Sequence, residues 1–224
     1  MSPILIFDLD DTLYPEKSFV DSGFRAVASW MQQQYGWDDQ LSLGRMNAIL
    51  SEKGRGAVFN QWLAENGVAS RKAVLRCIQV YRHHMPAISL YPQARSILAR
   101  LGSKPYLVTD GHKVVQYNKV KALHLENQCA KVLLTHRYGI QHEKPSTLCF
   151  QRILERERCD WTDLIYVGDN PAKDFVGLNP IGVRTIRVKT GGHANVLAKP
   201  GFDAQHTIDD LSLLPDVLPD IDWR

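Results

Sequence analysis

Residues 3–13 read PILIFDLDDTL, a short apolar run that stops abruptly at a group of acidic residues. A continuous apolar run such as Ile4 to Phe7 is typical of a strand that is buried on both faces, as in a parallel sheet. Similar runs predict further strands at 106–109, 131–135, 164–167 and 181–188. Helical patterns fill the intervals between most of them. Strands that alternate with helices predict an α/β fold with a Rossmann-like, doubly wound parallel sheet.

The stretch after the first strand breaks this alternation. Apolar residues recur at helical spacing between residues 15 and 90, and Ser70 is a candidate N-cap for the last of these helices. Pro15 and Pro92 bracket the stretch. The sequence therefore predicts a catalytic core built from residues 1–14 and 91–224, with an inserted all-helical domain at residues 15–90.

Composition and charge exclude several classes of protein. The 224 residues include 27 Lys and Arg against 24 Asp and Glu, a net charge of +3 that is too small to indicate a nucleic-acid partner. No apolar run approaches the ~18 residues of a membrane helix. The four cysteines have no CxxC spacing and the first residues lack a basic region, so we expect reduced thiols in a cytoplasmic protein. The sequence leaves the oligomeric state open.

Acidic and hydroxyl side chains gather where the predicted strands end. In an open parallel sheet, ligands bind beyond the carboxyl ends of the strands, and carboxylates that lie close together repel one another unless a cation or protons intervene. Hard oxygen ligands without a His or Cys cluster favour Mg²⁺ over Zn²⁺. Three such pairs, Asp8/Asp10, Thr109/Asp110 and Asp169/Asp174, follow predicted strands, and their carboxylates predict a Mg²⁺ site at this sheet edge.

Four motifs in order resemble those of the haloacid dehalogenase superfamily. They are Asp8-Leu9-Asp10-Asp11-Thr12, Val108-Thr109-Asp110-Gly111, Lys144-Pro145 and the GDxxxxD pattern of residues 168–174. Each falls on the expected type of element, with the lysine of the third motif opening a helix. One departure stands out, because Asp110 occupies a position where the family usually has Asn. The inserted helical stretch is similar to the C1-type cap of that superfamily.

The resemblance implies a role for each motif residue. Asp8 is the expected nucleophile, which forms an aspartyl-phosphate, and Asp10 is the expected general acid and then general base. Thr109 would donate a hydrogen bond to the phosphoryl group. Lys144 would neutralise charge on the nucleophile and on the phosphoryl oxygens.

The resemblance also implies a metal site and a substrate site. Asp8, the backbone carbonyl of Asp10, and Asp169 would bind Mg²⁺, with Asp174 as a further ligand or as a support behind the ligands. Asp110 and Gly111 are candidates for substrate binding in the core. In the helical domain, we expect Lys17, Arg25 and Arg55 to reach the site and to contact the leaving group of the substrate.

The expected activity is Mg²⁺-dependent hydrolysis of a small phosphorylated metabolite, either a sugar phosphate or a nucleoside monophosphate. Asp10 argues against a dehalogenase, because a halide leaves without a proton and an ester oxygen does not. A phosphomutase with the same intermediate remains an alternative. A non-catalytic binding protein on the same scaffold is another, although Asp8, Lys144 and Asp169 are all retained.

Overall fold

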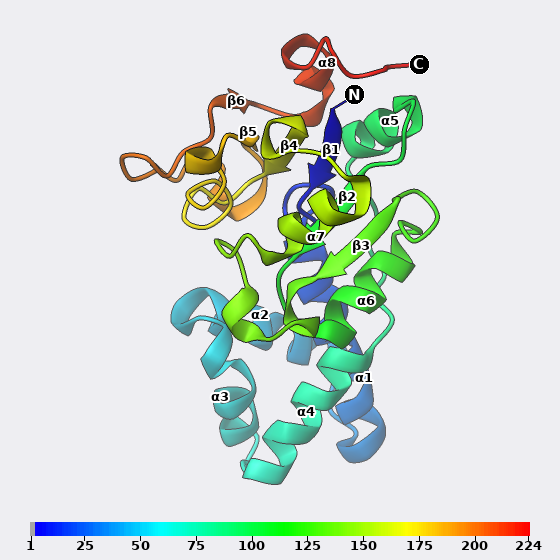
Figure 1. Cartoon of the computed structure of the whole chain (residues 1–224). Helices are drawn as coiled ribbons and strands as arrows, with labels where there is room; N and C mark the ends of the chain where they lie inside the picture. The colour runs from blue at the N-terminus through cyan, green and yellow to red at the C-terminus, as the bar shows by residue number, and fades with distance from the viewer. Residues whose placement is uncertain (1–2) are drawn as a thin grey trace. The chain divides into compact units, whose positions relative to one another are not determined.

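The computed structural model describes residues 3–224 (Figure 1). The chain divides into two compact units. The first, the α/β unit, contains the chain up to Glu16 together with Ser89–Arg224, and the second, the helical unit, is Lys17–Ile88. The helical unit is therefore an insertion between the first and second strands of the α/β unit.

Parallel strands form the centre of the α/β unit. Over residues 3–224 the sheet has six strands in the order β3-β2-β1-β4-β5-β6, and every neighbouring pair is parallel. Their bounds are β1 (Ile4–Phe7), β2 (Tyr106–Thr109), β3 (Lys131–Leu134), β4 (Leu164–Gly168), β5 (Arg184–Val188) and β6 (His206–Ile208). The predicted α/β fold with a doubly wound parallel sheet is confirmed.

Two details of the strand prediction were wrong. The fifth strand begins at Arg184 rather than at residue 181, because Asn179–Ile181 form a 3₁₀ turn and Gly182 has a φ of +87°, which lies outside the extended region. The strand β6 was missed. Two of its three residues, His206 and Thr207, are exposed, so it has no apolar run to indicate it.

The strand order places the topological switch point of the sheet beside the end of β1. Chain connections lead from β1 to β2 and β3 on one side, and β4 pairs with β1 on the other side. Phe7 pairs with Val167 in register, and the Asp8 N–H donates to the Val167 carbonyl at 2.8 Å. The residues that follow β1 and β4 therefore lie side by side at the switch point, where open α/β sheets bind ligands.

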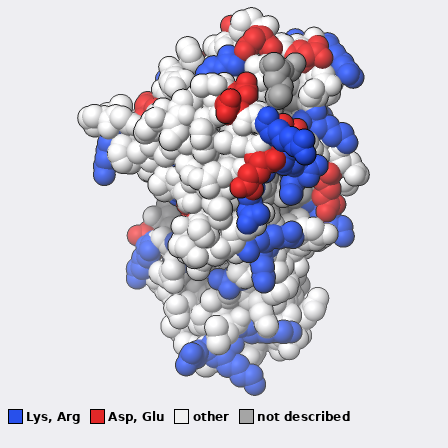
Figure 2. Space-filling view, viewed as in Figure 1, with Lys and Arg blue, Asp and Glu red and all other residues white. Residues whose placement is uncertain are grey.

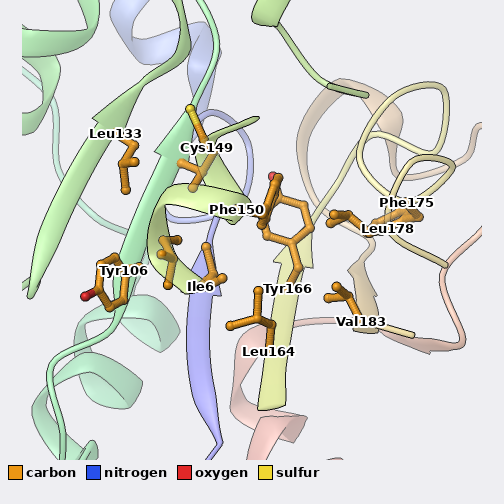
Figure 3. Close-up of a cluster of buried hydrophobic side chains, with 12 residues drawn as sticks. Ile6, Tyr106, Leu133, Cys149, Phe150, Leu164, Tyr166, Phe175, Leu178 and Val183 are labelled. Carbon is orange, nitrogen blue, oxygen red and sulfur yellow. The ribbon is translucent and has the colours of Figure 1, made fainter. Parts of the chain in front are cut away.

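A tightly packed core holds these strands in place. The helices of the α/β unit are α5 (Pro92–Arg100), α6 (Lys113–Ala122), α7 (Leu148–Glu157) and α8 (Leu214–Val217). Alternate residues of β1, β2 and β4 face α7, where Phe150 packs edge to face on Tyr166 at 5.1 Å between ring centroids (Figure 3). The side chain of Tyr166 lies in this apolar layer, and its hydroxyl reaches the polar site described below.

The third motif does not open a helix, which corrects the sequence prediction. Lys144 and Pro145 lie in a turn closed by the Ser146 N–H donating to the Glu143 carbonyl at 2.9 Å. The helix α7 begins later, at Leu148. Lys144 is held instead by carboxylates, which bind both its backbone N–H and its ammonium group.

The helical unit has its own apolar core. Its helices are α1 (Glu16–Tyr35), α2 (Asp39–Lys53), α3 (Val58–Glu65) and α4 (Arg71–His83). One stripe of α1 packs with residues of α2, α3 and α4 around the buried Trp62. The Ser70 hydroxyl accepts from the Ala73 N–H at 3.1 Å, which confirms the predicted N-cap of α4. That this unit acts as a cap stays a prediction.

Surface charge is distributed differently over the two units. On the visible face of the α/β unit, acidic and basic side chains are interspersed, whereas basic side chains predominate on the visible face of the helical unit (Figure 2). Helix α4 contributes Arg71, Lys72, Arg76 and Arg82. Within residues 3–224, no helix has both the length and the apolar character that a bilayer-spanning segment requires.

Candidate active site

Asp8 lies at the centre of a buried polar cluster beyond the end of β1. Its side chain is 7% exposed, and its Oδ1 lies 2.7 Å from the Lys144 Nζ. One carboxylate oxygen from each of Asp8, Asp169 and Asp174 lies within 4.8 Å of the others. The structure thus brings together three carboxylates and a lysine that are far apart in the sequence.

Lys144 joins two of these carboxylates. Its Nζ is 2.7 Å from the Asp174 Oδ1 as well as from Asp8, and it donates to the Tyr166 hydroxyl at 2.8 Å. Burial alone would lower the pKa of Lys144, but the attraction of Asp174 and Asp8 outweighs it and raises that pKa well above its usual value. Lys144 is therefore a fully charged ammonium at neutral pH.

The buried carboxylates carry more negative charge than Lys144 balances. Burial raises the pKa of Asp8 to about 8, against the opposing attraction of Lys144. Burial also raises the pKa of Asp169, although a hydrogen bond from His193 opposes the rise. Without a cation, both carboxyl groups bind protons more tightly than exposed aspartates do.

This excess of carboxylates fits a hard divalent cation. The donors from Asp8, Asp169 and Asp174 are all oxygen atoms, and all three residues are buried. Oxygen donors with this charge suit Mg²⁺, for which water and substrate oxygens complete the coordination. The donor set is therefore compatible with the Mg²⁺ predicted from the sequence.

His193 is a neighbour of this cluster that the sequence analysis did not select. Its Nδ1 lies 2.8 Å from the Asp169 Oδ2, and this contact raises the pKa of the imidazole. Asp11, Asp169 and His193 form a second group whose ligand atoms lie within 4.8 Å of one another. His193 ends the short 3₁₀ turn Gly191–His193, which follows β5.

Asp10 is held by side chains of a different element. Its Oδ1 accepts from the Lys119 Nζ at 2.6 Å and from the Tyr14 hydroxyl, and its Oδ2 accepts from the Gln116 Nε2 at 2.9 Å. Burial alone would raise the pKa of Asp10, but the Lys119 ammonium and these hydrogen bonds lower it. Neither Gln116 nor Lys119 was predicted from the sequence, because polar side chains on an amphipathic helix usually face water.

The second motif places its two polar residues in different networks. The Thr109 Oγ1 accepts from the Gln116 Nε2 at 2.6 Å. The Asp110 Oδ1 accepts from the Thr135 hydroxyl at 2.9 Å and from the Lys144 N–H at 3.2 Å, and its Oδ2 accepts from the Lys173 Nζ at 2.9 Å. Asp110 thus anchors the turn that carries Lys144.

Electrostatics keep the Asp110 carboxylate charged. Burial opposes ionisation, but the Lys144 and Lys173 cations lower the pKa of Asp110. Asn in this position could not make the same ion pair with Lys173. The following residue, Gly111, has a φ of +127°, a backbone conformation that favours glycine.

The three candidates in the helical unit are exposed. Lys17 pairs with Asp21 and donates to the Asn47 Oδ1 at 2.9 Å, both within that unit. Arg25 lies on α1, and Arg55 begins a short 3₁₀ turn after Gly54. Their contact with a substrate stays a prediction.

The polar cluster can support group transfer to a carboxylate. Asp8 presents an oxygen beside a permanent cation and beside a site suited to a divalent ion, and Asp10 places a second carboxyl group two residues further along the chain. A nucleophile, compensation for negative charge, and a proton donor are the groups that transfer of a phosphoryl group requires.

Known proteins share both the sequence pattern and the fold. The glyceraldehyde 3-phosphate phosphatase of Methanocaldococcus jannaschii is 27% identical over 97% of this chain and 97% of that protein. The ribulose-1,5-bisphosphate 5-phosphatase of Halopiger xanaduensis is 25% identical over 97% of this chain and 100% of that protein. The solved structure of a 2-haloacid dehalogenase from Pseudomonas syringae pv. Tomato DC3000 has a TM-score of 0.62 at 24% identity, over 98% of this chain and 99% of that chain, which is a likeness of fold alone.

The polar cluster lies within the part of the chain that matches a known protein family. Residues 5–188 match the family described as haloacid dehalogenase-like hydrolase, and this range contains all four motifs. The sheet order and the carboxylates beyond β1 and β4 agree with that match. The chain therefore belongs to the haloacid dehalogenase-like hydrolase family.

Proposed function

We propose that the protein is a Mg²⁺-dependent phosphomonoesterase that hydrolyses a small sugar phosphate through an aspartyl-phosphate on Asp8. The observation that carries the proposal is the buried Asp8 carboxylate, 2.7 Å from Lys144 and grouped with Asp169 and Asp174. Relatives that align over nearly the whole chain are named as phosphatases of glyceraldehyde 3-phosphate and ribulose 1,5-bisphosphate, which favours a sugar phosphate over a nucleotide.

The first half of the reaction would use Asp8 and Asp10. A carboxylate oxygen of Asp8 forms a bond to phosphorus while the bond from phosphorus to the ester oxygen breaks. Asp10 gives its proton to that oxygen, so the alcohol leaves neutral. Lys144 and the Thr109 hydroxyl would compensate the charge on the phosphoryl oxygens.

The second half would return the enzyme to its starting state. Asp10, now ionised, takes a proton from water, and the water oxygen attacks phosphorus while the bond from Asp8 to phosphorus breaks. Inorganic phosphate leaves and Asp8 is again a carboxylate. Asp8, Asp169 and Asp174 would hold Mg²⁺, whose positive charge would offset the negative charge of the phosphoryl oxygens and help to orient them toward the nucleophile.

The low pKa of Asp10 is compatible with an acid role once substrate is bound. In the structure without substrate, Lys119 and two further donors favour its ionised form. A phosphate dianion placed beside Asp10 would repel the carboxylate and raise its pKa. The proton needed for the leaving group can therefore be taken up together with the substrate.

The helical unit is proposed to act as a cap. An aspartyl-phosphate needs shielding from stray water while the leaving group departs, and the site must then open for product release. Lys17, Arg25 and Arg55 are the cationic candidates in this unit for recognition of the substrate. The insertion of the unit directly after the first motif supports this assignment.

Two other activities fit less well. Dehalogenation does not require a proton donor at Asp10, and the likeness to a dehalogenase structure concerns the fold. A phosphomutase would need cap residues that hold the sugar while phosphate returns to it, and nothing in the sequence marks them. A non-catalytic binding protein would have no need to keep Asp8, Lys144 and Asp169 together.

A screen of phosphorylated metabolites tests the proposal. The protein is incubated with Mg²⁺ and a panel of triose, pentose and hexose phosphates and nucleoside monophosphates, and released phosphate is measured. We expect preferential hydrolysis of a sugar phosphate by the wild type and none by Asp8→Asn. Failure to release phosphate from any ester, or equal release by Asp8→Asn, would overturn the proposed function.

A further inference from the structure

Two polar side chains of α6 are buried against Asp10. Gln116 is 1% exposed and Lys119 is 3% exposed, although lysine is rarely buried completely. Residues three apart lie on the same face of a helix, so both side chains leave α6 in the same direction. Burial of an ammonium group is costly unless it is paired, and the pair here is Lys119 with Asp10.

The contacts fix both oxygens of the Asp10 carboxylate. Lys119 donates to Oδ1 at 2.6 Å and Gln116 donates to Oδ2 at 2.9 Å. A carboxylate with a strong donor on each oxygen cannot rotate about its terminal torsion without losing one of them. The direction of the Asp10 side chain is therefore set by α6 as well as by its own backbone.

Gln116 also connects Asp10 to the second motif. Its Nε2 lies 2.6 Å from the Thr109 Oγ1, and an amide nitrogen has two hydrogens to donate. The Gln116 side chain thus bridges the proposed proton donor, Asp10, and Thr109, which is proposed to bind the phosphoryl group.

We propose that Gln116 and Lys119 are positioning residues for Asp10, which hold its carboxyl group in line with the leaving oxygen of the substrate. The inference rests on the proposed function, because it assigns Asp10 the transfer of a proton to that oxygen. Both side chains act through Asp10, because they donate to its carboxylate oxygens. Because these side chains would align the Asp10 carboxyl group, their loss should slow only those reactions in which the leaving group needs the proton of Asp10.

The leaving group separates this role from a merely structural one. An alkyl phosphate such as glyceraldehyde 3-phosphate expels a strongly basic alkoxide, which needs a proton. The 4-nitrophenolate released from 4-nitrophenyl phosphate is stable without one. General acid catalysis contributes roughly 10²- to 10⁴-fold, and a misaligned acid forfeits part of that factor. Damage to the fold would lower both rates alike.

The kinetic test compares the two esters for Lys119→Met and Gln116→Leu. We expect kcat/KM for glyceraldehyde 3-phosphate to fall about 10- to 100-fold further than kcat/KM for 4-nitrophenyl phosphate. Lys119→Arg should restore part of the difference, because it keeps the charge. Lys121→Met, an exposed lysine on the same helix, is the matched control and should leave both rates unchanged. In an Asp10→Asn background, Lys119→Met should add no further discrimination between the esters.

A crystal structure of Lys119→Met gives a readout that does not depend on activity. We expect the Asp10 side chain to leave its present position or to occupy several, while Asp8 and Lys144 keep their contact of 2.7 Å. If Lys119→Met does not fold, Gln116→Leu is used for both measurements. Equal losses on the two esters, no loss on either, or an unmoved Asp10 would overturn the positioning role. An inactive wild type would instead contradict the proposed function, and the position of Asp10 in the crystal would still decide this inference.

Discussion

Replacement of Asp8 by Asn should remove hydrolysis and, in the absence of Mg²⁺, make the protein more stable. The substitution keeps the size of the side chain and replaces an ionisable carboxyl group, buried beside Asp169 and Asp174, by a neutral amide. Lys144 retains its second partner, because its Nζ also lies 2.7 Å from the Asp174 Oδ1. The remaining ammonium is therefore still paired in the variant.

The size of the stability change follows from the pKa of Asp8. That pKa rises from 3.8 in an exposed aspartate to about 8 in the folded protein. At pH 7 the Asp8 carboxyl group is ionised in the unfolded chain and protonated in the folded chain. The free energy of unfolding is therefore lowered by roughly three pKa units, or about 4 kcal/mol. Loss of the contact with Lys144 offsets part of this gain. We expect a net stabilisation of about 1–2 kcal/mol, which corresponds to a rise in Tm of about 2–8 °C.

Thermal unfolding with and without Mg²⁺ tests this reasoning. A carboxyl group with a raised pKa costs no stability below its unfolded pKa and becomes costly as the pH rises toward the folded pKa, so the advantage of Asp8→Asn should shrink between pH 7 and pH 4. Added Mg²⁺ should reverse the order, because it stabilises the wild type more than the variant. Phosphate release should fall by several orders of magnitude. A metal-free variant less stable than the wild type at pH 7, or a variant that retains turnover, would refute the reasoning.

Three further predictions concern the metal and the helical unit. Mg²⁺ must displace a proton from Asp8, whose pKa is raised to about 8, so its apparent affinity should increase about tenfold between pH 6 and pH 7. Calorimetry in two buffers of different ionisation enthalpy measures the proton release, and an affinity that does not change with pH would contradict it. Asp169→Ala should raise the Mg²⁺ concentration needed for half-maximal activity at least tenfold, with little change in Tm. Full activity of the wild type after exhaustive EDTA treatment would count against a metal site. Arg55→Ala should raise KM for the best sugar phosphate several-fold more than KM for 4-nitrophenyl phosphate, whereas an equal fall of kcat on both esters would place Arg55 among the reacting groups.

The sequence predicted those parts of the fold that depend on continuous apolar runs. The strands β1, β2 and β4 are buried on both faces, so each reads as an unbroken run that ends at the polar residues of the site. The short edge strand β6 has two exposed residues of three and gave no such signal. The prediction that a helix begins at Pro145 was wrong, because proline is common both at the first position of a helix and in turns. Only tertiary contacts distinguish these two settings.

Sequence reasoning missed the polar residues that support the site. Lys119 lies on a helix whose apolar residues suggested an ordinary amphipathic pattern, and a lysine at such a position usually faces water. Its burial depends on Asp10, which is 109 residues away in the chain. His193 follows a pair of glycines in a loop, where periodicity carries no information, and its partner Asp169 is 24 residues away in the chain. Partners of this kind become visible only when the fold brings the strand ends together.

The charged side chains at this sheet edge form three groups, which differ in how many carboxylates each cation neutralises. This difference explains why one of the groups suits a metal ion. Asp10 is matched by Lys119, and Asp110 is matched by Lys173. Asp8 and Asp174 instead share the ammonium of Lys144, and Asp169 pairs with His193, so these three carboxylates exceed their one permanent cation by two negative charges when all are ionised. One divalent cation would cancel that excess, whereas two protons would cancel it in its absence. Burial raises the pKa values of Asp8 and Asp169, and repulsion from Asp174 adds to the rise. Asp10 lies outside this group because it has a lysine of its own, so the proposed proton donor and the proposed metal-binding nucleophile keep separate charge partners although they are two residues apart.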